Sequence, residues 1–240
     1  PEVRVYCFGG TQHGAGTGRP ASAPDRGQLI GNPADYRPLL RALLTALDEW
    51  VRAGKEPPRS VYPRITDGTL AGWRERESGW HALPGVRYPE VLHAPEFLDR
   101  GSEFFSHRRS SIEPPISRGQ FGVKVPACGA DNNELGALLL PAVAVPVGTY
   151  TSWNLRSRAR GAENELVSLA GGYIPFVKTA AERERLGDPR PSLRDRYSSF
   201  DDYSRQFRAA AESLISQRYL LAEELESQMK SIEWLRKSFE

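Results

Sequence analysis

Residues 3–14 read VRVYCFGGTQHG, an apolar run that passes directly into a glycine-rich turn carrying a histidine. The apolar run over 3–8 predicts a buried strand. A histidine at the C-terminal tip of such a strand has a fixed backbone, and small neighbours leave room for a substrate. We therefore take His13 as the leading candidate for a general acid–base group. The plainer interpretation is a turn histidine that only satisfies backbone groups.

A helix is predicted after a polar, glycine-rich loop over 9–31. Asn32 suits the N-cap, Pro33 the first helical position and Asp35 the first turn. Gly54 suits the end of the helix. Helical spacing places eight apolar residues on one face: Tyr36, Leu39, Leu40, Leu43, Leu44, Leu47, Trp50 and Val51. Strand, histidine loop and helix together form the closing unit of an α/β layer, which we assign to residues 1–54.

The rest of the chain divides into two further parts. Residues 55–180 carry many prolines, and we expect an irregular region with short strands that covers the core, with apolar pieces at 86–88, 121–125 and 138–145. Residues 181–240 are predicted to be helical. Ser199 and Asp202 resemble a capping box, followed by a stripe of Tyr203, Phe207, Ala211, Leu214, Ile215 and Arg218. A second stripe, Leu221, Leu225, Ile232, Leu235 and Phe239, predicts a helical hairpin.

Composition excludes several classes of partner. The 240 residues include 32 Lys and Arg against 30 Asp and Glu, a formal net charge of +2, so there is no electrostatic case for nucleic acid or an anionic membrane. The longest apolar run, 138–147, is interrupted by two prolines and is shorter than the roughly 18 residues of a membrane helix. The chain has no signal peptide and does not begin with Met, so we expect it to derive from a longer polypeptide.

The remaining chemistry-bearing residues give weak signals. Cys7 and Cys128 do not form a metal-ligand pair; Cys7 is expected to be an inert buried thiol, and a disulfide between the two is left open. The glycine cluster at 14–19 lacks the spacing of a dinucleotide or phosphate loop, because Arg19 stands where a small residue is needed.

Three other histidines, His81, His93 and His107, are scattered and have no ligand at a tight interval. A metal-dependent hydrolase that uses His13 with His81 or His93 remains a minor alternative.

A nucleophile is missing from the sequence. The Gly-x-Ser-x-Gly elbow does not occur, and Ser106, Ser110, Ser111 and Ser152 lack the small neighbours that such a turn requires. In α/β hydrolases the chain order is nucleophile, acid, histidine. If His13 is that histidine, its two partners should lie upstream of Pro1.

Several segments together resemble one family. Residues 3–13 are similar to a V-R-x-Y-x-x-x-G-T-Q-H pattern of the bacterial α/β-hydrolase domain family, and residues 148–156 to its G-T-x-T-x-W-N-L-R block. Residues 32–51, 172–176 and 187–193 resemble other blocks of that family. The resemblance is weakest over 55–140.

The resemblance implies an α/β fold: the C-terminal part of an α/β-hydrolase-type sheet, from the strand before the catalytic histidine onward, with an irregular proline-rich middle and a C-terminal helical hairpin. It implies a serine hydrolase acting on small-molecule carboxylic esters, with no metal and no cofactor. Only His13 carries over as a catalytic residue, so an upstream hydrolase fragment would carry the nucleophile and the acid. The alternative is a non-catalytic binding or assembly module whose proline-rich middle and helical hairpin contact a partner.

Overall fold

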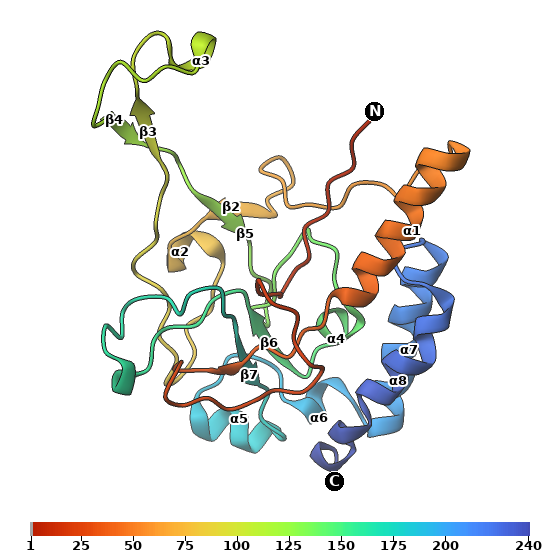
Figure 1. The fold of residues 1–240 in the computed structure, drawn as a ribbon. Helices are drawn as coiled ribbons and strands as arrows, with labels where there is room; N and C mark the ends of the chain where they lie inside the picture. The colour runs from red at the N-terminus through yellow and green to blue at the C-terminus, as the bar shows by residue number, and fades with distance from the viewer. Residues whose placement is uncertain (1) are drawn as a thin grey trace.

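The computed structural model describes residues 2–240, which form short strands and helices joined by long irregular segments (Figure 1). The strands are β1 (Ile30–Gly31), β2 (Leu70–Gly72), β3 (Glu96–Asp99), β4 (Ile116–Gln120), β5 (Lys124–Pro126), β6 (Gly148–Thr151) and β7 (Gly172–Pro175). The helices are α1 (Arg37–Ala53), α2 (Glu75–Ser78), α3 (Phe104–His107), α4 (Pro141–Ala144), α5 (Ala180–Leu186), α6 (Leu193–Arg196), α7 (Phe200–Ser216) and α8 (Leu225–Ser231). Three 3₁₀ turns complete the set: η1 (Arg158–Arg160), η2 (Ala222–Glu224) and η3 (Glu233–Ser238).

The described strands pair antiparallel. The central sheet has the order β1-β7-β6, with Tyr173 of β7 opposite both Ile30 of β1 and Tyr150 of β6. β2 pairs with β5, and β3 with β4. The chain is thus mixed α and β, as expected, but the described residues contain no parallel multi-stranded sheet of the α/β-hydrolase kind. Parallel pairing is limited to isolated bridges.

Those bridges replace the strand predicted over 3–8, which is wrong in extent. Tyr6 pairs with Val61 and Phe8 with Leu138, each at a single residue. The Cys7 amide donates to the Val61 carbonyl (2.8 Å), and the Leu138 amide donates to the Cys7 carbonyl (2.8 Å). The segment is extended because it is wedged between two distant parts of the chain, and neither of them runs alongside it far enough to form a ladder.

Helix α1 begins four residues later than predicted. Arg37 is its first residue, Pro38 occupies the first turn, and Tyr36 is the N-cap without a side-chain capping bond. The N-cap prediction for Asn32 is wrong: its side-chain oxygen accepts from the Ala34 amide in a local turn, but the chain becomes helical only after Tyr36. The end at Gly54 is confirmed, with the left-handed backbone (φ 67°) that favours glycine.

The buried face of α1 also differs from the prediction. Leu39, Ala42 and Ala46 are the buried side chains of its core-facing side. Four apolar residues expected on that face are exposed instead: Leu40, Leu44, Leu47 and Val51. Leucines recur so densely in this helix that two stripes fit the helical period, and the smaller alanines lie on the side that packs.

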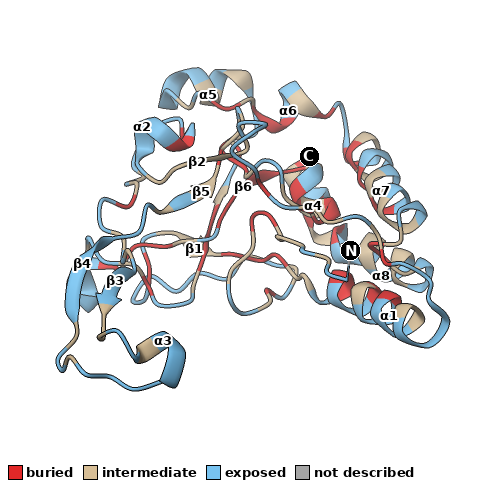
Figure 2. Cartoon of the chain, turned by 90° about the horizontal axis from the view of Figure 1, so that it is seen from above, coloured by how far each residue is buried: buried red, intermediate tan, exposed pale blue. Residues whose placement is uncertain are grey.

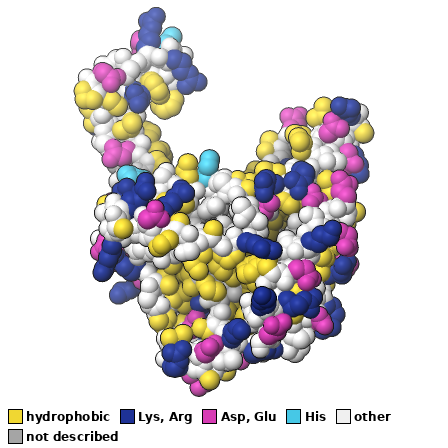
Figure 3. Space-filling view, turned by 60° about the horizontal axis from the view of Figure 1, so that its bottom comes forward, with side chains coloured by type: hydrophobic (Ala, Val, Ile, Leu, Met, Phe, Trp, Pro, Cys, Tyr) yellow, Lys and Arg dark blue, Asp and Glu magenta, His cyan; other side chains and the backbone are white. Residues whose placement is uncertain are grey.

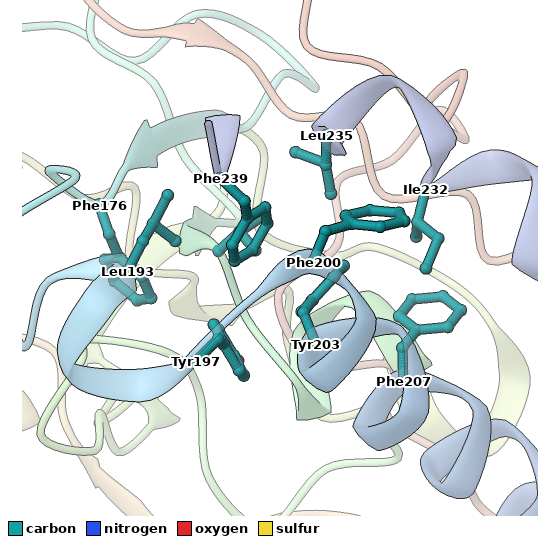
Figure 4. Packing of buried hydrophobic residues seen from close by; sticks show 10 residues of the cluster. Phe176, Leu193, Tyr197, Phe200, Tyr203, Phe207, Ile232, Leu235 and Phe239 are labelled. Carbon is teal, nitrogen blue, oxygen red and sulfur yellow. The ribbon is translucent and has the colours of Figure 1, made fainter. Parts of the chain in front are cut away.

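Two apolar clusters hold the helices to the sheet. One joins Leu39, Leu138, Tyr150, Tyr173 and Tyr219 with neighbours from α4. The other gathers α7 and the C-terminal turns, and Figure 4 shows its aromatic and aliphatic side chains facing one another. Its members are Val147, Phe176, Leu193, Tyr197, Phe200, Tyr203, Phe207, Ile232, Leu235 and Phe239.

The C-terminal helices match the sequence pattern in part. The Ser199 hydroxyl accepts from the Asp202 amide and caps α7, but the predicted capping box is only half formed, because the Asp202 carboxylate accepts from the Ser198 amide. Tyr203, Phe207 and Ala211 are buried. The second predicted helix is broken into η2, α8 and η3. Ile232 and Leu235 are three residues apart, the 3₁₀ repeat, and the last turn keeps both on the core.

The segment before β6 departs from the expected strand over 138–145. α4 lies there, because Pro141 fits the first turn of a helix and lacks the N–H that a strand would use.

Earlier in the chain, β3, α3 and β4 form an arm that projects from the body (Figure 1). Figure 2 shows the arm almost wholly exposed, whereas buried residues gather along the central strands and the inner sides of the helices.

Candidate active site

His13 lies on the loop between the first extended segment and β1, and its side chain is exposed. Its carbonyl accepts a hydrogen bond from the hydroxyl of Tyr36, which stacks on Phe8 with ring centroids 5.8 Å apart. No described residue hydrogen-bonds the imidazole ring. Tyr36 therefore fixes the backbone of His13, while the imidazole ring is left free to contact a substrate or a second polypeptide.

Asn32 fastens this loop to the central sheet. Its buried amide nitrogen donates to the Gly10 carbonyl (2.9 Å) and to the Thr151 carbonyl at the end of β6 (3.0 Å). Its side-chain oxygen accepts from the Ala34 amide (2.8 Å). One side chain thus joins the histidine loop, β6 and the approach to α1.

Gln12, the neighbour of His13, adds a second link to the sheet. Its side-chain oxygen accepts from the Gly171 amide at 2.6 Å, just before β7. A Cβ atom at position 171 would stand 2.2 Å from the Thr151 carbonyl oxygen, so only glycine allows this approach. Gln12 lies in the 3–13 segment and Gly171 directly precedes the 172–176 segment, two of the segments that resemble the α/β-hydrolase family.

Glu134 is a site residue that sequence reasoning missed. Its carboxylate accepts from the Gly10 amide at 2.9 Å, within the turn that leads to His13. Burial raises the pKa of Glu134 above its ordinary value, although hydrogen bonds from Gly10 and Ser152 oppose the shift. Nothing in the local sequence signals this role, because the two partners are 124 residues apart.

Backbone conformation and close packing require glycine at two positions of the histidine loop. Gly10 has φ +64° and lies against Val143 and Tyr150. At Gly16 a Cβ atom would stand 2.2 Å from the backbone of Pro33, and its amide donates to the Ala34 carbonyl at 2.7 Å. The glycine cluster therefore lets the loop pack closely on the chain before α1.

A cavity of about 360 Å³ opens beside His13 and includes its neighbours Gln12 and Gly14 in its wall. Two arginines, Arg19 and Arg26, and the apolar Leu29 and Leu169 also line it. A cavity of this size, with apolar walls and a few polar groups, suits a small organic molecule.

The described residues do not provide His13 with a serine. Ser106 and Ser110 belong to the arm, where the Ser106 hydroxyl contacts the ring of its own neighbour His107 (2.9 Å). Ser152 is exposed and hydrogen-bonds Glu134. Within residues 2–240 the structure therefore brings no hydroxyl into a hydrogen bond with the His13 ring.

The cysteines are unreactive thiols in this fold. Cys7 and Cys128 are both free. Burial, with the nearby Glu134 carboxylate, raises the pKa of Cys7 and raises that of Cys128 to about 12, so both stay protonated. Among the described residues, no group of three or more His, Cys, Asp or Glu side chains is placed to hold a metal ion.

The chain matches the family model described as alpha/beta hydrolase domain over residues 1–230. It belongs to this family. No curated protein and no solved structure matches this α/β hydrolase chain. Every helix in the part of the hydrolase chain that the structure describes is too short or too polar to cross a membrane.

Proposed function

We propose that this α/β hydrolase chain supplies the acid–base histidine, His13, for the hydrolysis of small carboxylic esters. The observation that carries the proposal is an exposed imidazole on a loop fixed by Asn32, Gln12 and Glu134, whose neighbours Gln12 and Gly14 line a cavity. Membership of a hydrolase family supports the reaction class. The ester substrate is a proposal that rests on this combination.

The chemistry assigned to His13 is a proton shuttle. As a serine hydroxyl attacks the ester carbonyl, the neutral ring takes the hydroxyl proton. The ring then gives that proton to the departing alkoxide, leaving an acyl-enzyme. Water repeats the two transfers and releases the acid. Because the ring is exposed and its backbone is held, it can serve both transfers without rearrangement of the loop.

The nucleophile and its acid partner are assigned to polypeptide outside residues 1–240, an upstream hydrolase fragment. Exposed apolar side chains offer a surface on which that polypeptide would pack. Leu40, Leu44, Leu47 and Val51 recur every three or four residues along α1, and Val51 is 78% exposed. The Arg4 guanidinium carbon lies 5.2 Å from the ring centroid of Trp50 in the same helix. The exposed Val3 and Val5 beside Arg4 therefore extend this apolar surface.

The direct test is His13→Ala in the intact polypeptide, with p-nitrophenyl butyrate as substrate. We expect kcat to fall by several powers of ten, since losing the base of a hydrolytic triad costs on the order of 10⁶. His93→Ala is the matched control because His93 is also an exposed loop histidine. Unchanged turnover in the His13 variant would remove the assigned role.

A fluorophosphonate probe tests the division of the site. It should label a serine in the intact protein and leave the 240-residue chain alone unlabelled. Specific labelling of a serine within this chain would show that the nucleophile is here and not on another segment.

A second candidate function, an assembly module, is favoured by the arm. Phe97, Phe105 and Phe121 are exposed on it, and Figure 3 shows two projections with a hollow between them. The helical hairpin is not the contact surface expected from the sequence, because its stripe of Tyr203 and Phe207 is buried. Light scattering after size exclusion separates the candidates: a monomer that turns over esters contradicts the assembly role.

A further inference from the structure

A second cavity lies on the other side of the histidine loop, between α1, the central sheet and the C-terminal helices. Its volume is about 230 Å³, and it shares only Thr17 with the wall of the cavity beside His13. At roughly 30 Å³ per water molecule it has room for about eight waters, or for one small organic molecule. Nothing in the proposed ester chemistry uses it.

Two tyrosine hydroxyls in the wall of this cavity lack partners. Tyr203 is fully buried, and its hydroxyl has no hydrogen-bond partner. Tyr150 is 4% exposed, and no described residue hydrogen-bonds its hydroxyl. Burial raises the pKa of both groups, so both remain donors at neutral pH.

Two neighbouring buried tyrosines, in contrast, use their hydroxyls in hydrogen bonds to backbone carbonyls. Tyr173 donates to the Val147 carbonyl (3.2 Å), and Tyr197 donates to the Pro146 carbonyl (2.9 Å). In native proteins most buried hydroxyls are satisfied in this way, and an unsatisfied one needs an explanation. Here the buried, unsatisfied hydroxyl of Tyr203 belongs to the same cavity wall as Tyr150, whose hydroxyl no described residue hydrogen-bonds.

Charges around the mouth of the cavity are paired with one another. Arg41 contacts Glu224 at 2.5 Å, and Asp35 contacts Arg37 at 2.7 Å. The remaining polar groups there are uncharged, among them Ser227, which is exposed. A charged ligand would find no free counter-ion among these groups, so the mouth favours a neutral molecule.

We propose that this cavity binds a small uncharged compound with a hydroxyl group on an apolar body, such as a phenol-sized alcohol. Its hydroxyl would pair with Tyr150 and Tyr203, and its apolar part would lie against Phe207 and Trp234 in the same wall. This binding does not depend on His13.

Calorimetry with phenol, and with benzene as the ligand that lacks the hydroxyl, tests the site on the intact protein. Tyr203→Phe and Tyr150→Phe should each weaken phenol binding about fivefold, the effect of one net hydrogen bond, and leave benzene unchanged. Tyr197→Phe is the matched control, because it removes a buried hydroxyl from the same cluster but not from the cavity wall.

Ser227→Trp provides a second test that leaves the core intact, since position 227 is exposed at the mouth. It should abolish phenol binding while the melting temperature stays the same. The proposal is overturned if phenol does not bind the wild-type protein, if the two phenylalanine variants bind it as tightly as the wild type, or if Ser227→Trp leaves binding intact. A crystal structure with only ordered water on both hydroxyls after a phenol soak would also overturn it.

Discussion

Replacing Asn32 with alanine is the sharpest test of how the histidine loop is held. The substitution removes three hydrogen bonds, two donated to the Gly10 and Thr151 carbonyls and one accepted from the Ala34 amide. All three backbone partners belong to buried residues, so water cannot readily replace the lost side chain.

The expected cost follows from these bonds. At about 1 kcal/mol of net stability each, the variant should lose about 3 kcal/mol of unfolding free energy. In a protein of this size 1 kcal/mol shifts the melting temperature by about 2–4 °C, so Asn32→Ala should melt about 6–12 °C lower. Ester turnover should fall as well, because the loop that carries His13 loses its link to β6.

Thermal unfolding followed by circular dichroism measures the effect, with Gln28→Ala as the matched control. Gln28 also donates two side-chain hydrogen bonds, to the Arg156 and Glu163 carbonyls, but it is exposed. Water replaces such bonds, and we expect a loss below about 1 kcal/mol. If Asn32→Ala melts within 2 °C of the wild type, the side chain does not hold the loop as argued.

Three further substitutions have defined outcomes. Glu134→Gln keeps an acceptor for the Gly10 amide and removes the buried charge. Because the folded state raises the pKa of Glu134, the free energy of unfolding of the wild type should fall as pH rises from 4.5 through that higher pKa. Urea titrations should show the stability of the variant relative to the wild type growing over this pH window and then levelling. Arg190→Met leaves the buried Asp188 carboxylate without its 2.7 Å partner and should cost about 3–5 kcal/mol in the same assay; a loss below 1 kcal/mol would contradict this. Phe207→Ala removes a buried aromatic ring from the core and should cost about 3–5 kcal/mol, whereas an unchanged melting curve would mean that the core relaxes around it.

Sequence reasoning succeeded where a structure depends on neighbours in the chain. The ends of helices at Gly54 and Ser199 follow from one residue's backbone preference and one side-chain hydrogen bond. The start of α1 failed for the opposite reason. Asn32 followed by proline has the local pattern of an N-cap, and its side-chain oxygen does accept from the Ala34 amide, but the helix begins only at Arg37. The side-chain nitrogen instead ties this segment to Gly10 and Thr151, and no local pattern reveals those partners.

The same distinction explains the candidate site. His13 could be selected from its strand-like and glycine-rich surroundings, and its exposure is compatible with the proposed role. Glu134 could not, because a carboxylate in an irregular segment becomes a loop anchor only when the fold brings Gly10 to it. The central sheet could not be predicted from the sequence either, because β1 is only two residues long and is a strand only through its pairing with β7.

The pairing of β1 with β7 has a consequence for how this protein is made. Residues 6–32 have hydrogen-bonding partners at positions 61, 138, 151 and 171–173, and all of these except the first lie more than a hundred residues further along the chain. A ribosome that has released the histidine loop must synthesise another 140 or so residues, roughly ten seconds of translation or more, before that loop has a surface to fold on. Late loop closure of this kind makes folding slow. The loop that carries His13 would thus acquire its full set of contacts late in synthesis, and a nascent chain stalled before β7 would lack the Gly171 and β7 contacts that hold this loop.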